Sequence, residues 1–68
     1  MMHVTLTLDC KAPFKVKLKE KTTIRQLLVE HKINLETGII QLNGKIAHPD
    51  TQLKDTDTVE FIGVIYGG

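Results

Sequence analysis

Cysteine is almost absent from this sequence of 68 residues, and so are side chains arranged for catalysis. A lone cysteine, Cys10, cannot form an intramolecular disulfide framework, a four-cysteine zinc site or a plant-type iron–sulfur centre. His3, His31 and His48 lack the spacing of metal ligands, and the sequence contains no nucleophile–base pair or glycine-rich phosphate loop. We therefore expect no metal site, no bound cofactor and no enzymatic activity of the chain itself.

Excess charge and long apolar runs are also missing. Nine basic and eight acidic side chains give a formal net charge of +1, which argues against electrostatic binding to nucleic acid. Apolar runs fall well short of the roughly 20 residues that a membrane-spanning helix needs, and residues 1–5 do not resemble a signal peptide. The composition predicts a small, soluble, cytoplasmic domain with no direct nucleic-acid partner and no membrane partner.

The sequence begins with an alternation of apolar and polar residues that is typical of half-buried strands. In residues 3–10 the apolar side chains occupy the even positions. The alternation returns in residues 14–19, with Phe14 in phase with the core and lysines on the outer face. Only residues 11–13 separate the two runs, so we expect a hairpin at the start of the chain.

The period then changes to that of a helix. Thr23 is followed three residues later by Gln26, the pattern of a capping box at a helix start. The residues at 24, 27, 28 and 31 share one helical face. We expect His31 and Lys32 in the last turn and Asn34 just past the end. A helix of two to three turns is too short to persist alone in water, so its apolar face must pack on the sheet.

Three further strands are predicted after the helix. Residues 38–42 and 45–47 flank Asn43-Gly44, a strong signal for a two-residue hairpin turn. Residues 58–66 begin as another alternating strand. The first hairpin therefore reaches the later strands through a connection that contains the helix, which favours at least one parallel pair.

This order of elements predicts the fold class. It is α+β: a ubiquitin-like β-grasp, with one helix across one face of a mixed four- to five-stranded sheet. We expect a single domain over residues 1–68, with a flexible diglycine tail at residues 65–68.

The last strand leads into an apolar strip. Phe61 takes the core side, so Ile62 and Val64 lie on the outer face and continue toward Ile65 and Tyr66. Contiguous exposed apolar surface usually marks a partner site, and tyrosine is a frequent interface anchor. We predict that these outer-face and tail residues bind partner proteins.

The sequence ends at Gly67-Gly68. Without a Cβ atom, glycine lets the backbone pass through a channel that is too narrow for side chains. At roughly 3.3 Å per residue, a four-residue extension reaches about 13 Å beyond the sheet. The carboxylate of Gly68, presented in this way, can enter the ATP site of another enzyme and be activated there.

Together these features resemble the ThiS/MoaD family of ubiquitin-like sulfur carriers, which includes the small archaeal modifier proteins. The resemblance covers the chain length, the order of elements, the acidic turn before the last strand and residues 64–68. One departure is visible: the family often has Asp-Gly-Asp at that turn, whereas residues 55–57 here are Asp-Thr-Asp. This difference bears on the local turn type.

The resemblance implies a specific chemistry. An E1-like enzyme of the ThiF/MoeB type would adenylate the carboxylate of Gly68 with ATP, and a persulfide sulfur would displace AMP to leave a thiocarboxylate. Gly67 would give the tail access to that enzyme, and ATP would be bound by the partner only. The sulfur would pass to an acceptor enzyme such as thiazole synthase, the molybdopterin synthase large subunit or a tRNA thiolase. The carrier would be a monomer when free.

Two other functions stay open. In the first, the activated Gly68 is joined to lysines of target proteins, as in a ubiquitin-like modifier. In the second, the chain is a β-grasp protein- or RNA-binding module and the diglycine is incidental. Deletion of Gly68 separates these classes, because only the carrier and the modifier depend on the terminal carboxylate.

Two remaining features have alternative interpretations. Lys15, Lys17 and Lys19 share the outer face of the second strand, where they either discourage edge-to-edge aggregation or form a basic stripe for tRNA or an acidic partner. The absence of stacking aromatic residues from the stripe favours the first. Cys10 is expected to pack as a small apolar residue rather than to relay sulfur.

Overall fold

The computed structural model describes residues 1–9 and 11–63. In this part of the chain, the elements follow the predicted order, with one short 3₁₀ helix (η1) added before the third strand. Their bounds are β1 (Met2–Leu8), β2 (Phe14–Leu18), α1 (Ile24–Glu30), η1 (Leu35–Thr37), β3 (Gly38–Leu42), β4 (Lys45–Ile46) and β5 (Thr58–Gly63).

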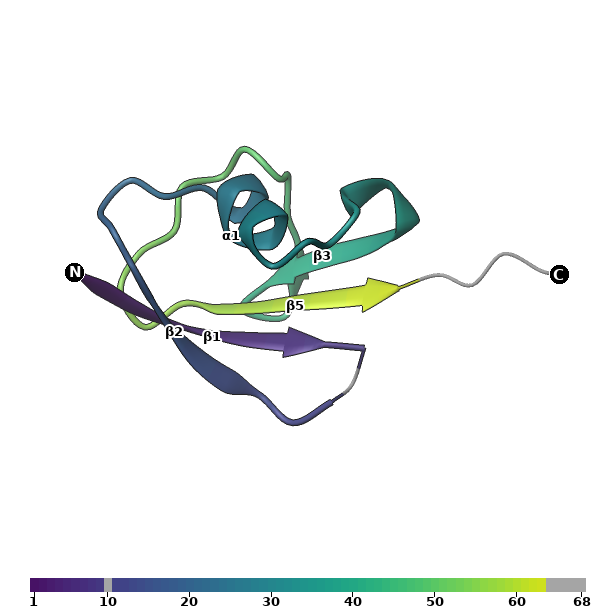
Figure 1. Ribbon diagram of the computed structural model, residues 1–68, viewed down its shortest axis with the longest axis horizontal. Coiled ribbons are helices and arrows are strands. Elements are labelled where there is room, and N and C mark those ends of the chain that lie inside the picture. The colour runs from purple at the N-terminus through teal and green to yellow at the C-terminus, as the bar shows by residue number, and fades with distance from the viewer. Residues whose placement is uncertain (10, 64–68) are drawn as a thin grey trace, which may run out of the picture.

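The strands form one mixed sheet in the order β2-β1-β5-β3-β4. The first and last strands of the chain, β1 and β5, lie side by side and run parallel, whereas the other neighbours are antiparallel. The helix α1 lies across one face of the sheet (Figure 1). The predicted α+β class, the single helix and the parallel pair are thereby confirmed, and the sheet has five strands.

The core lies between α1 and the covered face of the sheet. All three buried residues of the helix are completely inaccessible to solvent, and the even positions of β1 face them. Full burial of such an aliphatic side chain stabilises the fold by roughly 1.5–3 kcal/mol. The buried residues are Met2, Val4, Leu6, Leu18, Ile24, Leu27, Leu28, Ile40, Leu53, Val59 and Phe61.

The start of α1 is the predicted capping box. The side chain of Thr23 accepts a hydrogen bond from the N–H of Gln26 at 3.2 Å, and the Gln26 side chain accepts one from the N–H of Thr23 at 2.9 Å. Two backbone donors at the helix start are thereby satisfied.

The end of α1 differs from the prediction. The helix ends at Glu30 with His31 as its C-cap, so His31 and Lys32 are not in the last turn. Lys32 takes a left-handed conformation, with φ of 59°. Its N–H donates to the carbonyl of Val29 at 2.9 Å, and the N–H of Ile33 donates to that of Leu28 at 3.0 Å. These two hydrogen bonds form a Schellman motif. The helix therefore ends just before His31, the last residue of the predicted helical face.

Two side chains lie elsewhere than expected. Phe14 is 41% exposed although it lies on the same face of β2 as Val16 and the buried Leu18, because it begins an edge strand. Its ring centroid lies 5.9 Å from that of His31. Asn34 does not follow the helix end directly but caps η1, where its side chain accepts a hydrogen bond from the N–H of Glu36 at 3.0 Å. Cys10 lies outside the described residues.

The Asn43-Gly44 hairpin is confirmed between β3 and β4. Both residues have positive φ angles, 51° and 86°, as a type I′ turn requires. The side chain of Asn43 also accepts a hydrogen bond from the N–H of Thr58 at 2.9 Å and donates one to Asp57 at 3.1 Å. The hairpin is therefore joined to the loop that precedes β5.

Candidate functional site

The candidate site is the end of the sheet at which β5 leads into the C-terminal segment. Of the residues predicted to bind partners, Ile62 is described and lies on β5. The predicted partner-binding residues Val64, Ile65 and Tyr66, and the predicted reactive Gly68 with Gly67 before it, lie outside the described residues. The structure therefore describes the end of β5 at Gly63, to which these residues are joined. We call this end the base of the tail.

On one side, that base is held by the end of β1. The N–H of Gly63 donates a hydrogen bond to the carboxylate of Asp9, and the N–H of Asp9 donates to the carbonyl of Phe61 at 2.8 Å. A Cβ atom on Gly63 would lie 2.8 Å from Asp9 Oδ1. A larger residue at position 63 would thus displace the carboxylate that holds the last described residue of β5.

On the other side, the base is held by the start of β3. Gly38 pairs with Gly63 across the two strands. A Cβ atom on Gly38 would overlap the backbone carbonyl of Ile62 and lie 2.6 Å from the ring of Phe61. Both neighbours of β5 therefore pack closely against its last described residues.

Apolar side chains gather on the uncovered face next to that base. Ile62 lies opposite Ile39 of β3, and both point away from the core that holds Ile40. Ile46 of β4 is paired with Gln41, which places it on the same face. Ile39 is 43% and Ile46 77% exposed. We call Ile39, Ile46 and Ile62 the isoleucine patch.

Two members of this patch, Ile39 and Ile46, are not evident from the sequence alone. The run Ile39-Ile40 shows that one isoleucine must lie on each face of the strand, because side chains alternate. Which of them is buried depends on the pairing of β3 with β5, where Ile40 lies opposite Phe61. Ile46 belongs to a strand of two residues, which is too short to show a period.

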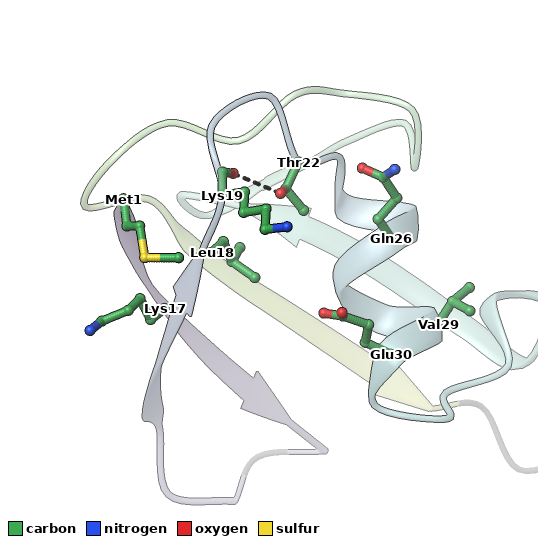
Figure 2. Close-up of a pocket in the computed structure, with 8 residues that line it drawn as sticks. All are labelled: Met1, Lys17, Leu18, Lys19, Thr22, Gln26, Val29 and Glu30. Atoms are coloured by element: carbon green, nitrogen blue, oxygen red, sulfur yellow. Dashed lines mark hydrogen bonds between the residues drawn. The ribbon is translucent and has the colours of Figure 1, made fainter.

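Within residues 1–9 and 11–63, no three His, Asp or Glu side chains are placed to hold a metal ion. A pocket of about 500 Å³ opens between α1 and the end of β2 (Figure 2), next to Leu18 and Val29.

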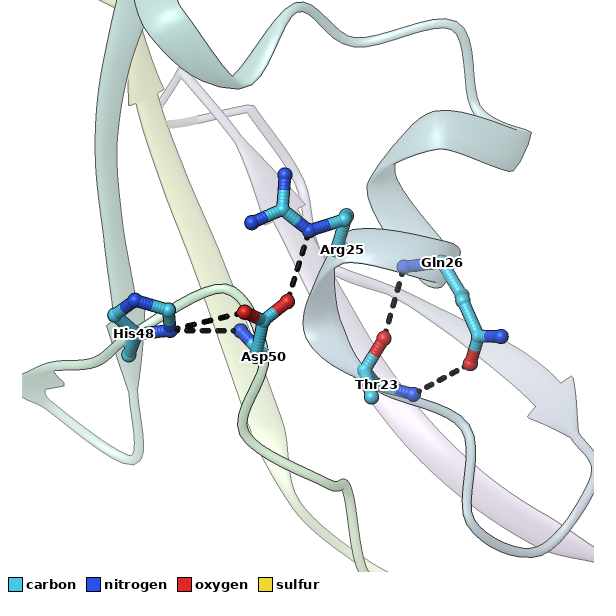
Figure 3. A network of polar contacts seen from close by, with 5 residues as sticks. All are labelled: Thr23, Arg25, Gln26, His48 and Asp50. Atoms are coloured by element: carbon cyan, nitrogen blue, oxygen red, sulfur yellow. Dashed lines mark hydrogen bonds and ion pairs between the residues drawn. The ribbon is translucent and has the colours of Figure 1, made fainter.

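One ion pair connects the start of α1 to the loop before β5 (Figure 3). The guanidinium Nε of Arg25 donates to Asp50 Oδ1 at 2.9 Å. This hydrogen bond, with the positive charge of Arg25, holds the pKa of Asp50 below its usual value. His48 accepts a hydrogen bond from the backbone N–H of Asp50 at 3.0 Å, through Nδ1.

Comparison with known proteins shows which sequences and folds this chain is similar to. A sequence model of the ThiS family matches residues 7–68. The crystal structure of the thiamine biosynthesis protein ThiS from Geobacter metallireducens is 32% identical, with 94% of this chain and 99% of that chain covered and a TM-score of 0.65.

Two other solved structures share the fold. A chain of the complex of subunits 1 and 2 of Molybdopterin-converting factor from Helicobacter pylori 26695 is 21% identical, with a TM-score of 0.68 over 98% of this chain and 100% of that chain. The ubiquitin of Caldiarchaeum subterraneum is 14% identical, with a TM-score of 0.70 over 98% of each chain. The predicted β-grasp fold is thereby confirmed. Within the described part of the chain, no helix has the length and apolarity to cross a membrane.

Proposed function

The chain belongs to the ThiS family of ubiquitin-fold sulfur carriers, and from this premise we propose that its reactive group is the C-terminal carboxylate of Gly68. The observation that carries the proposal is the match to the family over residues 7–68, which includes the diglycine end. In this proposal the chain is the protein substrate of an activating enzyme and contributes no catalytic side chain.

The proposed chemistry occurs on the main chain. The Gly68 carboxylate attacks the α-phosphorus of ATP in an E1-like partner, pyrophosphate leaves, and an acyl adenylate forms. The terminal sulfur of a persulfide then attacks the carbonyl carbon and AMP leaves. A second thiol reduces the resulting acyl disulfide to a thiocarboxylate. The partner supplies the metal and the donors that stabilise the developing charge, as an enzyme must for acyl transfer.

We propose that the isoleucine patch is the docking surface for this partner and for the sulfur acceptor. Ile39 is exposed opposite Ile62, one residue before β5 ends, and Ile46 is exposed on β4 opposite Gln41, so a protein that covers the whole patch also reaches the end of β5. Removal of clustered, exposed apolar side chains from water contributes favourably to the free energy of binding a partner. The thiamine and molybdopterin proteins among the similar structures suggest an acceptor in one of those two biosynthetic pathways.

Deletion of Gly68 tests the proposal. We expect the full chain, supplied with ATP, an E1-like enzyme and a persulfide donor, to exchange one carboxylate oxygen for sulfur. Mass spectrometry must locate the change in the C-terminal peptide, because oxidation of Met1 or Met2 gives nearly the same mass at the other end. The shortened chain should fold normally and remain unmodified.

The same measurement separates the alternatives. Gly68 linked to lysines of other proteins would establish a ubiquitin-like modifier instead. A terminus that stays unmodified with every component present would exclude both functions and leave a binding module.

A further inference from the structure

The strand β2 forms a free edge of the described sheet. Its neighbour in the described sheet is β1 alone, which separates β2 from the isoleucine patch of β3, β4 and β5. An edge strand directs part of its backbone N–H and C=O groups outward, where another strand can pair with them.

The register shows which residues present these groups. The N–H of Thr5 donates at 2.9 Å to the carbonyl just before β5, so the backbone of Thr5 faces β5. Successive residues of a strand direct their backbone groups to opposite sides, so Val4 faces β2, where its partner is Val16. Val16 is therefore bonded to β1, whereas the N–H and C=O groups of Lys15 and Lys17 point away from the described sheet.

The two faces of this edge differ in chemistry. On the helix side lie the half-buried Val16 and the buried Leu18, and the pocket of about 500 Å³ opens beside Leu18. Met1 and Val29 add apolar atoms to that pocket, Lys17 and Lys19 line it from the strand, and Glu30 lines it from the helix. Figure 2 shows Leu18 directed toward α1 and Lys17 directed away from it.

The opposite face carries two lysines. Lys15 and Lys17 are exposed there, two residues apart on the same face of β2. Their partners on β1 are Thr5 and His3, respectively. The strand therefore offers outward backbone groups and two lysines on one face, with Val16, Leu18 and a pocket of mixed lining on the other.

We propose that the edge of β2 binds an extended segment of a partner protein, in which apolar and acidic residues alternate, as an added strand. Residues opposite Lys15 and Lys17 lie on the outer face and pair best when acidic. The residues between and beside them lie on the side of Val16 and Leu18, where apolar side chains pack best. The register thus specifies a five-residue pattern of apolar, acidic, apolar, acidic, apolar.

Charge argues against a second copy of the chain as the occupant. Two β2 strands that pair with each other would bring lysines of one chain near lysines of the other, and like charges in adjacent strands are destabilising. The proposed segment instead neutralises both lysines and fills the pocket. This inference does not depend on the chemistry proposed for Gly68, because it uses a different part of the surface.

A peptide titration tests the proposal. The probe is acetyl-Ile-Asp-Val-Glu-Leu-amide, and the control is the same composition in block order, acetyl-Asp-Glu-Ile-Val-Leu-amide. In ¹H–¹⁵N NMR spectra of the full chain, we expect the alternating peptide to shift the amides of Lys15, Lys17 and Val29. The block peptide should bind about ten-fold more weakly, because it places acidic and apolar groups on both faces.

Two sets of variants separate charge from backbone pairing. The double variant Lys15→Glu/Lys17→Glu should lose about ten-fold in affinity for the acidic peptide and gain affinity for acetyl-Ile-Lys-Val-Lys-Leu-amide. Lys17→Pro removes an outward N–H while leaving the bonds of Val16 to β1, a position at which an edge strand tolerates proline. Lys17→Gln is its matched control, since it removes the charge alone. Binding should be weaker for Lys17→Pro than for Lys17→Gln.

Several outcomes would overturn the proposal. These are equal affinity for both peptides, shifts centred on the isoleucine patch, or equal affinity of Lys17→Pro and Lys17→Gln. Concentration-dependent dimerisation through the same amides would assign the edge to a second copy, and tighter binding of a single-stranded RNA would assign it to nucleic acid. A chain without Gly68 should bind the peptide unchanged, so failure of the proposed carrier function is distinguishable from failure here.

Discussion

At the scale of single residues, Thr56 is the least favourable residue of the described backbone. It takes a φ of 69°, in the left-handed region where β-branched residues are rare. Its N–H donates to the carbonyl of His3 at 2.9 Å, and the N–H of His3 donates to Asp55 at 2.8 Å. These hydrogen bonds to β1 hold the turn in a conformation that suits glycine. The ThiS/MoaD family, which the sequence resembles, often has glycine at this position.

Replacement of Thr56 by glycine should therefore stabilise the protein. The left-handed conformation costs a non-glycine residue roughly 1–2 kcal/mol, and the greater freedom of glycine in the unfolded chain offsets about 0.5–1 kcal/mol of the gain. We expect Thr56→Gly to raise the free energy of unfolding by about 0.5–1 kcal/mol in urea denaturation.

Thr58→Gly is the matched control. Thr58 begins β5 and is exposed, without a positive φ angle. Glycine there should lower stability by about 0.5–1 kcal/mol. Equal changes in the free energy of unfolding for the two substitutions would show that backbone strain at Thr56 does not lower the stability of the protein.

At the scale of elements, α1 depends on the loop before β5. The N–H of Ile24 donates to the carbonyl of Thr51 at 3.0 Å, and that of Arg25 donates to Pro49 at 2.8 Å. The first turn of a helix has no acceptors of its own for these donors, so the loop supplies them. The Arg25–Asp50 pair adds a side-chain link to the same loop (Figure 3).

This link predicts a pH dependence with a defined sign. The pKa of Asp50 is lowered in the folded chain, mainly by the hydrogen bond from Arg25. The contribution of the pair is therefore present above the ordinary pKa of the carboxyl group and is lost as pH falls through its lowered value. Both side chains are at least half exposed, so screening by water and salt keeps the contribution small.

An NMR titration of the Asp50 carboxyl group measures the effect. We expect Arg25→Gln to raise the pKa of Asp50 toward its ordinary value, and 1 M salt to do so partly. Lys54→Gln removes a positive charge elsewhere in the same loop and should leave the pKa of Asp50 unchanged. An unchanged pKa in Arg25→Gln would contradict the assigned cause.

At the scale of the whole molecule, the uncovered face of the sheet is divided in two. The isoleucine patch lies on β3, β4 and β5 beside the start of the tail, and Lys15 and Lys17 lie on β2 at the other edge. The helix covers the opposite face (Figure 1). In the proposals made above, a small domain can thus contact one partner at the isoleucine patch and another at the edge of β2 without overlap.

Charge placed in the isoleucine patch should impair activation without unfolding the chain. We expect Ile39→Asp and Ile46→Asp each to lower kcat/KM for adenylation by about ten-fold, or roughly 1.4 kcal/mol of transition-state stabilisation. Ile62→Asp should act in the same direction, and so should Tyr66→Asp in the tail.

Val29→Asp is the control for this prediction. Val29 is also an exposed apolar residue, at 59%, but it lies on the helix. Its substitution should leave adenylation unchanged. Thermal unfolding must stay near that of the unmodified chain for all exposed positions, and a parallel loss of stability in Ile39→Asp would assign that residue to the core instead.

Local chemistry in the sequence determined the elements and their order. The period-two runs, the Thr23–Gln26 capping box and the Asn43-Gly44 turn each involve neighbours in the chain, so the same residues that carry the signal also make the contacts. The alternation in β5 likewise identified Phe61 as buried. The predicted roles of residues 64–68 stay predictions.

Only the tertiary structure decided which surfaces are free. The Asp9–Gly63 contact joins residues 54 positions apart, and the choice of Ile39 as the exposed isoleucine follows from the pairing of β3 with β5. Phe14 is exposed because its strand lies at the edge of the sheet. Local propensity specifies the direction in which a side chain can point, whereas long-range pairing determines what lies there to cover it.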